Sequence, residues 1–445
     1  MLENILTEIS HLPTHNLVGK VLSIKGLLVE CCGIEKILSV GARCQIEGLN
    51  AVGGVTSKVI AEVVGFREDR ALLMPFGGLE GIGLGAKVTF LGSESAVYPD
   101  ESWLGRVINP MCEPMDSKGI VPVGEVAYKL RGKPPPAHTR QRVKGKIDLG
   151  IRSINTFLTC CKGQRMGIFA GSGVGKSVLM SMLARYSQAD VNVIGLVGER
   201  GREVQEFIED DLGAEGLKRS VVVVATSSDS ALLRRQAAYV TLCVAEYFRD
   251  QGRNVLCMMD SVTRFAMAQR EIGLSAGEPP TTKGYTPTVF SELPQMLERS
   301  GPGTITQGSI TGIFTVLVDG DDHNEPIADA VRGTLDGHIV LDRAIAERGR
   351  FPAVNILRSV SRTMPDCNTE ADNQLVEMAR QIISTYENMA EMIRLGAYKR
   401  GTDPDVDRAI QIYPAIDNFL RQRKDEPSDL ESGYATLSKI FGISR

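Results

Sequence analysis

Short apolar runs broken by glycine fill the first 90 residues. Around 18–29, 52–54 and 76–78, stretches rich in Val, Leu and Ile are interrupted by Gly every few residues. Regular turn signals between short β-rich runs are typical of a small barrel or sandwich. The pattern therefore predicts a β-barrel over residues 19–90.

The apolar residues that precede this region have a different spacing. Apolar residues recur at helical spacing at the very start of the chain, at Leu2, Ile5, Leu6, Ile9 and Leu12. This spacing predicts an amphipathic helix over residues 1–18. Such a helix either docks on its own barrel or stays available to a partner, and the pattern alone favours neither.

From residue 146 onward, compact apolar strands alternate with helical segments. The predicted strands cover 166–169, 191–197, 221–226 and 255–259. Alternation of this kind predicts an α/β domain with a parallel sheet, here over residues 146–364. Residues 91–145, which include three consecutive prolines at 134–136, form a connecting segment. Beyond Pro365, apolar stripes over 375–395 and 406–421 predict a helical C-terminal domain at 365–445.

Composition narrows the class of protein. The chain has 445 residues with 50 Lys and Arg against 54 Asp and Glu, a net charge of −4. This balance argues against nucleic acid as the main partner, since such proteins usually carry a large positive excess. No run is long enough for a membrane helix and no signal peptide is recognisable, so we expect a cytosolic protein. The 9 cysteines show no C-x-x-C pair and mostly sit in apolar runs, as structural filler.

The strongest chemical signal is the stretch 168–177, Ile-Phe-Ala-Gly-Ser-Gly-Val-Gly-Lys-Ser. A buried strand enters a glycine-rich loop, and a helix follows at once. This arrangement binds phosphates, because backbone N–H groups and the helix N-terminus point at the anion. Lys176 reaches the β- and γ-phosphates, and the hydroxyl of Ser177 binds Mg²⁺. Ala170 stands where the motif usually has its first glycine.

Two acids follow the next predicted strands. Glu199 follows Gly198 at the end of the strand at 191–197, and Asp260 comes directly after the strand at 255–259. Carboxyl ends of parallel strands share one edge of the sheet, the edge on which ligands bind. We therefore expect Glu199 to polarise the attacking water and Asp260 to hold Mg²⁺. Taken alone, Glu199 is better explained as an ordinary charged strand end, and it is the strand ending in Asp260 that favours a catalytic acid.

Two residues further along suit a nucleotide site shared between subunits. Arg362 follows a short strand with no local acid partner, as expected of an arginine finger donated to a neighbour. A surface ion pair is the plainer alternative for this residue. Phe351 has the chemistry to stack on adenine, although most single Phe residues belong to the core.

Four motifs together, at 169–177, 198–203, 259–264 and 352–361, resemble the rotary ATPase α/β superfamily. Within it, the stretches 266–272, 277–285 and 308–311 are most similar to the type III export ATPases, and to their flagellar branch in particular. The resemblance covers residues 100–445, and the barrel segment is compatible with it. Departures occur at Cys112 and at Gly284–Thr288, away from the nucleotide motifs.

The resemblance implies a RecA-like core that uses ATP or ADP with Mg²⁺. It assigns catalysis to Glu199, Lys176, Arg362 and the supporting Arg200, and a further supporting role to Arg264. Metal binding falls to Ser177 and Asp260. It assigns nucleotide binding to Gly171, Ser172, Gly173, Val174, Gly175, Lys176, Ser177, Val178 and Phe351.

The resemblance also implies partners and a location. It predicts a homohexamer at the inner face of the cell membrane, with no nucleic acid. The expected partners are a stator-like regulatory protein on the N-terminal helix, a central stalk protein, export substrates with their chaperones, and a membrane export gate.

Three other functions remain to be weighed against flagellar export. A virulence injectisome ATPase has the same chemistry, and neighbouring genes would separate the two. A non-catalytic rotary ATPase subunit usually lacks the acid found here at Glu199. A ring translocase on RNA needs a basic, aromatic surface, which 5% aromatic residues and the net charge disfavour.

Overall fold

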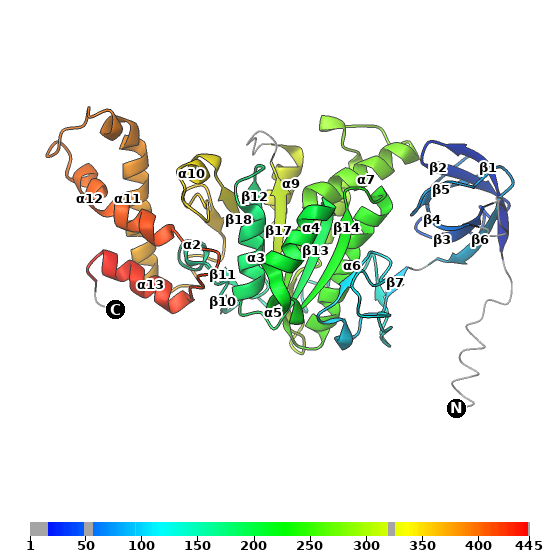
Figure 1. Ribbon diagram of the computed structural model, residues 1–445, viewed down its shortest axis with the longest axis horizontal. Helices are drawn as coiled ribbons and strands as arrows, with labels where there is room; N and C mark the ends of the chain where they lie inside the picture. The colour runs from blue at the N-terminus through cyan, green and yellow to red at the C-terminus, as the bar shows by residue number, and fades with distance from the viewer. Residues whose placement is uncertain (1–16, 49–56, 94, 319–324, 444–445) are drawn as a thin grey trace. The chain divides into compact units, whose positions relative to one another are not determined.

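The computed structural model describes residues 17–48, 57–93, 95–318 and 325–443 (Figure 1). They divide into two compact units. The first comprises the described residues up to Ala96 with Ser230–Leu233 and Ala268–Pro287, and the second comprises the remainder. The helix predicted over residues 1–18 lies outside the described ranges except at its end, where Val18 already begins the first strand.

The first unit is built on a closed barrel of six antiparallel strands. Around the barrel the order is β1-β2-β5-β4-β3-β6. The bounds are β1 Val18–Lys25, β2 Leu28–Cys32, β3 Arg43–Glu47, β4 Lys58–Arg67, β5 Arg70–Pro75 and β6 Lys87–Gly92. In β3, partly exposed and buried residues alternate, as expected where one face of a strand points into a barrel. The strand-and-glycine pattern thus encodes a closed barrel.

Two charged residues on the barrel strands are buried, Glu30 on β2 and Glu62 on β4, and Glu30 is the more deeply buried. Glu30, on β2, is only 2% exposed. Its carboxylate accepts hydrogen bonds from Arg70 Nη1 at 2.7 Å and from Lys25 Nζ at 3.1 Å. The hydroxyl of Ser23 and the cations of Arg70 and Lys25 hold the pKa of Glu30 at about 2, well below its usual 4.5.

The second unit contains a nine-stranded sheet. Its order is β19-β18-β12-β17-β15-β13-β14-β8, with β16 paired to β17. Strands β18 to β8 run parallel, and only β19 and β16 are antiparallel to their neighbours. The bounds are β8 Val107–Ile108, β12 Arg165–Ala170, β13 Val191–Glu199, β14 Ser220–Thr226, β15 Asn254–Asp260, β16 Gly301–Pro302, β17 Ser309–Leu317, β18 Gly337–Leu341 and β19 Val360–Ser361. The predicted parallel sheet is therefore confirmed.

Helices connect these strands. They are α2 Arg152–Phe157, α3 Lys176–Tyr186, α4 Gly201–Glu206, a π-helical turn at Phe207–Leu212, α5 Gly213–Lys218, α6 Ala231–Asp250, α7 Val262–Ala276, α8 Pro287–Leu297, α9 Pro326–Thr334 and α10 Arg343–Glu347. Shorter elements are β7 Ala96–Val97, β9 Tyr128–Lys129, β10 Lys146–Ile147, β11 Cys160–Cys161 and 3₁₀ turns at Glu101–Trp103 and Thr282–Gly284. One face of the sheet packs on α3, where Ile168 and Ile194 meet Leu183 in a continuous apolar core.

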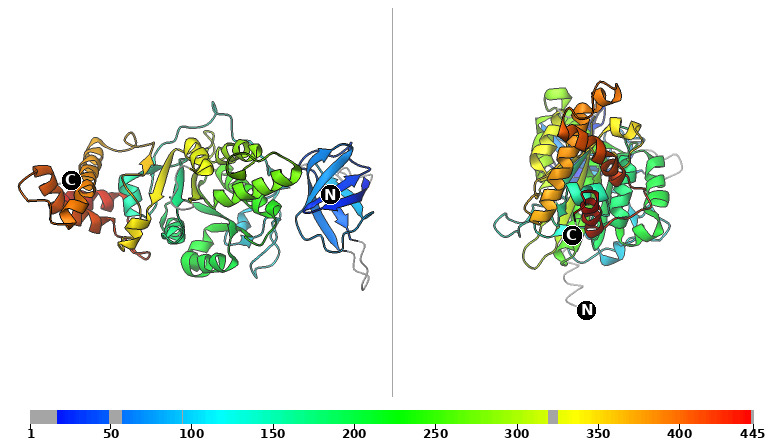
Figure 2. Two further views of the ribbon diagram at one scale, coloured as in Figure 1. Left: turned by 90° about the horizontal axis from the view of Figure 1, so that it is seen from above. Right: turned by 90° about the vertical axis from the view of Figure 1, so that its left-hand side faces the viewer.

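The C-terminal helices gather beyond the β18 side of the sheet, next to α2 (Figures 1 and 2). They are α11 Glu370–Arg394, α12 Pro404–Leu420 and α13 Leu430–Ile440. Side chains of Thr369, Asp403 and Asp429 cap their N-termini, which fixes where each helix begins. The predicted α/β fold with a parallel-sheet core, an N-terminal β-barrel and a C-terminal helical domain is confirmed. None of the helices described is long and apolar enough to cross a bilayer.

Candidate active site

A glycine-rich turn joins β12 to α3. The strand ends at Ala170 and the helix begins at Lys176, so residues 171–175 form the loop between them. Gly173 and Gly175 adopt φ angles of +77° and +89°, which residues with a side chain rarely reach. Among the described residues, no side chain caps the start of α3. The first N–H groups of that helix are therefore open to an anion.

Three charged side chains meet at the carboxyl end of the sheet. Lys176 forms an ion pair with Asp260 Oδ1, and its Nζ lies 3.7 Å from Oε1 of Glu199. They come together because β13 and β15 are parallel neighbours, with Leu196 opposite Asp260. All three side chains are largely buried, with exposed fractions of 11% for Lys176, 15% for Glu199 and 8% for Asp260.

The carboxylate of Glu199 is in an unfavourable setting for a negative charge. Burial and the neighbouring Asp260 raise its pKa to about 7, although Lys176 opposes the shift. From the described residues, its buried Oε1 accepts no hydrogen bond. Buried polar atoms are almost always satisfied, and exceptions mark sites where a ligand or water is expected. Glu199 is therefore placed to take a hydrogen bond from a molecule entering this site.

Ser177 and Val178 occupy the first turn of α3, directly after Lys176, and both are exposed. A free hydroxyl beside a phosphate-binding lysine suits metal coordination together with the Asp260 carboxylate. The positive-φ glycines, the open helix start, the lysine and the two acids fit a magnesium–nucleotide complex. The structure thus brings together six of the residues that the sequence singled out: Gly173, Gly175, Lys176, Ser177, Glu199 and Asp260.

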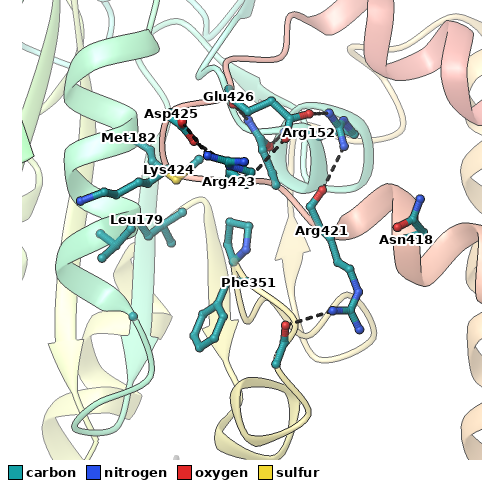
Figure 3. A pocket seen from close by; sticks show the side chains of 15 residues that line it. Arg152, Leu179, Met182, Phe351, Asn418, Arg421, Arg423, Lys424, Asp425 and Glu426 are labelled. Carbon is teal, nitrogen blue, oxygen red and sulfur yellow. Dashed lines mark hydrogen bonds and ion pairs between the residues drawn. The ribbon is translucent and has the colours of Figure 1, made fainter.

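A cavity of about 940 Å³ opens beside the glycine-rich loop (Figure 3). Leu179 and Met182 line it from α3, and Phe351 lines it from the loop after α10. The Phe351 ring lies close to the loop, since a Cβ placed on Gly175 would stand 3.4 Å from its Cδ1. With 46% of its surface exposed, Phe351 offers an apolar face of the kind on which a purine base stacks.

The far side of this cavity was not anticipated from the sequence. It is lined by residues 421–426, the segment between α12 and α13, and by Arg152. Arg152 pairs with Glu426, and Gln422 holds the segment by donating to Gly150 O at 2.8 Å. Charged residues in a turn between helices are typical of an ordinary solvent-facing loop. No local sequence signal therefore predicts that these residues line the cavity.

The predicted arginines lie away from the lysine–acid cluster. Arg200 is 81% exposed and its nearest ion-pair partner is Glu203, at 3.6 Å. Arg362 is exposed and follows β19, which pairs with the first residues of β18. Those residues lie at the end of the sheet opposite to the glycine-rich loop, because β18 and β12 run parallel. Arg362 is therefore out of reach of its own chain's site. Arg264, by contrast, packs against Gly198, because a Cβ added to Gly198 would lie 2.9 Å from the Cβ of Arg264.

A parallel sheet with this loop, lysine and pair of acids defines a P-loop nucleotide-binding protein. Comparison with known proteins identifies the family. Residues 150–361 match the nucleotide-binding domain of the ATP synthase alpha/beta family, residues 16–92 its beta-barrel domain, and residues 369–439 the T3SS EscN ATPase C-terminal domain. The chain belongs to the ATP synthase alpha/beta family and is an ATP-hydrolysing enzyme.

Individual relatives show which members of this family the chain resembles. The chain is 58% identical to a flagellum-specific ATP synthase of Caulobacter vibrioides over 99% of both chains. It is also similar to the assembled ATPase EscN of the type III secretion system of enteropathogenic E. coli, with a TM-score of 0.87 and 41% identity over 95% of this chain and 99% of that one. EscN in complex with its central stalk EscO matches with a TM-score of 0.85 and 40% identity over the same shares.

Proposed function

We propose that this protein is the ATPase of a flagellar protein-export apparatus, which hydrolyses Mg-ATP as a homohexameric ring. The observation that carries the chemistry is the cluster at the end of the sheet. There, Lys176 pairs with Asp260 and lies 3.7 Å from a Glu199 carboxylate oxygen that has no hydrogen-bond donor among the residues that the structure describes. Relatives named flagellum-specific ATP synthase support the flagellar role, at identities of 58% and 53% over nearly the whole chain.

Each group has a separate task in this proposal. Residues 171–175 and the start of α3 hold the phosphates through backbone N–H groups. Lys176 moves from Asp260 to the β- and γ-phosphates, while Phe351 packs on the base. Mg²⁺, held through Ser177 and Asp260, neutralises charge on the phosphates when it is bound. Glu199 accepts a hydrogen bond from the attacking water and orients it towards the γ-phosphate.

Ring assembly completes the site in this proposal. Arg362 is exposed and lies at the end of the sheet opposite to its own P-loop, so a neighbouring chain is the natural recipient of its guanidinium. A donated arginine stabilises the charge that develops on the transferred phosphoryl group. Arg200, exposed on the loop after Glu199, is free to support the same interface in the ring. The relatedness to EscN, which is described as an assembled ATPase, supports an oligomer.

The remaining parts of the proposal concern partners and place. By analogy with EscN and EscO, we place a central stalk protein in the ring. Residues 1–18 bind a stator-like regulatory protein, and the ring receives export substrates with their chaperones. It works in the cytoplasm against the export gate at the inner face of the membrane, without nucleic acid. A type III secretion ATPase is the second candidate, favoured by the 44% identity to such an enzyme of Xanthomonas euvesicatoria.

Deletion of the gene in its host tests both the branch and the chemistry. We expect loss of flagellar filaments, restored by the wild-type gene and not by one encoding Glu199→Gln. Filaments that persist in the deletion strain, together with lost secretion of effector proteins, would assign the protein to an injectisome. Restoration by the Glu199→Gln gene would remove Glu199 from the mechanism.

A further inference from the structure

A buried hydroxyl on the neighbouring strand contacts the metal-binding acid. The Oγ1 atom of Thr315, on β17, donates to Oδ1 of Asp260 at 2.6 Å. Thr315 is fully buried, and β17 lies directly beside β15, which ends in Asp260. The other acceptor near this hydroxyl, the carbonyl of Met259, is more distant at 3.4 Å. The geometry therefore directs the hydroxyl proton to the carboxylate.

In the part of the chain that the structure describes, the Asp260 side chain has two hydrogen-bonding partners, and both contact the same oxygen. Oδ1 takes the ion pair from Lys176 as well as the hydrogen bond from Thr315. Within the described part of the chain, Oδ2 accepts no hydrogen bond. The two partners thus fix Oδ1 on the protein side and leave Oδ2 directed elsewhere.

The two partners differ in what happens when a nucleotide binds. Lys176 has a flexible side chain on the P-loop helix and is drawn to the phosphates. Thr315 cannot follow, because it stands in the middle of a sheet between β12 and β15, opposite Ile168. Once the lysine leaves, the Thr315 hydroxyl is the contact that still restrains the carboxylate.

We propose that Thr315 is a positioning residue that holds Asp260 so that Oδ2 faces the magnesium site. The inference rests on the proposed role of Asp260 toward Mg²⁺. Groups that hydrogen-bond a metal-binding side chain orient it, and their loss typically weakens metal affinity by a factor of ten or more. This role could not be predicted from the sequence, since a threonine within an apolar strand is an ordinary β-former.

The test measures binding of a fluorescent ADP analogue to the full chain, with Mg²⁺ titrated in or with EDTA present. Thr315→Val removes the hydroxyl at nearly constant volume. We expect unchanged affinity in EDTA and an about tenfold increase in the Mg²⁺ concentration for half-maximal effect. Thr315→Ser keeps the hydroxyl and should restore the wild-type Mg²⁺ dependence.

A matched control lies on the same strand. Thr311 is also buried on β17, but its hydroxyl accepts from Gly163 N at 2.9 Å, near the opposite end of the strand. Thr311→Val should leave the Mg²⁺ dependence at the wild-type value. An equal shift in Thr311→Val and Thr315→Val would show a general effect of hydroxyl loss and overturn the inference.

The Asp260→Asn variant distinguishes a failure of the positioning role of Thr315 from a failure of the metal-binding role of Asp260. If this variant loses Mg²⁺ dependence and Thr315→Val keeps the wild-type value, the role of Thr315 is refuted while that of Asp260 stands. If Asp260→Asn itself binds the Mg-nucleotide like the wild type, the proposed metal role of Asp260 fails, and the inference about Thr315 fails with it. Reduced affinity of Thr315→Val in EDTA would indicate a damaged pocket and would also count against a positioning role.

Discussion

Nζ of Lys176 lies 3.7 Å from Oε1 of Glu199, while the same ammonium group pairs with Asp260. One cation thus sits between two buried acids, and only Asp260 is also held by a hydroxyl. Asp260 is fixed, whereas Glu199 keeps a buried oxygen to which none of the described residues donates a hydrogen bond. This asymmetry separates an acid that holds a ligand from one that is able to engage a water molecule.

Replacing Glu199 tests its role in hydrolysis. We expect Glu199→Gln to bind ATP normally and to hydrolyse it at least about 100-fold more slowly, because the amide is a far weaker proton acceptor. The melting temperature should not fall, since the substitution removes a charge that burial disfavours. Steady-state turnover and a thermal melt measure both. Glu206→Gln, which touches only an exposed ion pair with Arg202, is the control. Normal turnover in Glu199→Gln would contradict the assignment.

The donated arginine predicts complementation between two inactive variants. Arg362→Ala should reduce turnover by about 1,000-fold, the usual contribution of an arginine finger. Lys176→Ala should also be inactive, because it lacks the phosphate-binding ammonium. Mixing the two should recover activity, since an Arg362→Ala P-loop then receives the finger of a Lys176→Ala neighbour.

The control for this experiment is Arg358→Ala, a half-exposed arginine just before the same strand. It should stay active alone and give no gain on mixing. Absence of complementation in rings whose mixed composition is verified by mass spectrometry would argue that Arg362 acts within its own chain or only structurally.

Phe351 should affect nucleotide binding rather than the chemical step. Phe351→Ala removes the exposed aromatic face of the cavity, and we expect KM for ATP to rise about fivefold to tenfold with kcat little changed. Phe351→Tyr should restore KM. Val360→Ala, at a position of similar exposure, is the control. A fall in kcat at unchanged KM would place Phe351 in the catalytic step instead.

Glu30 predicts a pH-dependent contribution to stability. Its pKa is held at about 2 in the folded protein, so the carboxylate stabilises the fold fully above pH 4.5 and loses this effect as pH falls towards 2. Glu30→Gln should therefore lower the melting temperature at pH 7, by the equivalent of about 2 kcal/mol. The difference from the wild type should shrink as the pH is lowered from about 5. Calorimetric melts over this range, with Glu47→Gln on β3 as the partly exposed control, decide the matter. A difference independent of pH would contradict the ionic account.

The N-terminal segment makes a prediction about regulation. Removing residues 2–15 leaves β1 whole and should abolish capture by a stator-like partner while ATP hydrolysis persists. A charge on the apolar stripe (Leu6→Glu) should have the same effect, and a charge on the opposite side of the predicted helix (Thr7→Glu) should not. Equal capture of Leu6→Glu and the wild type in a pull-down would rule out the stripe as the binding face.

Much of this architecture can be predicted from local sequence. Strand β12, the glycine-rich loop and α3 are encoded within a short stretch, and so are the strands that end in Glu199 and Asp260. Parallel alternation then brings the two acids to the P-loop without further information.

Contacts between segments that are distant in the sequence cannot be predicted in this way. Thr315 looks like any strand threonine until β17 is known to lie beside β15. The segment 421–426 reaches the nucleotide cavity only because α12 and α13 pack back against α2. Arg200 adjoins Glu199 in sequence, yet it points to solvent in the single chain. Adjacency along a chain does not determine where a long, flexible side chain points.

Arg362 stands at the end of the sheet opposite to its own P-loop. If it works as a donated arginine finger, a monomer has an incomplete active site and hydrolyses almost no ATP. Specific activity would then rise with concentration until rings form and fall again on dilution. The cell would have no need of a separate inhibitor to spare its ATP pool, because recruitment to the export site would itself switch the enzyme on.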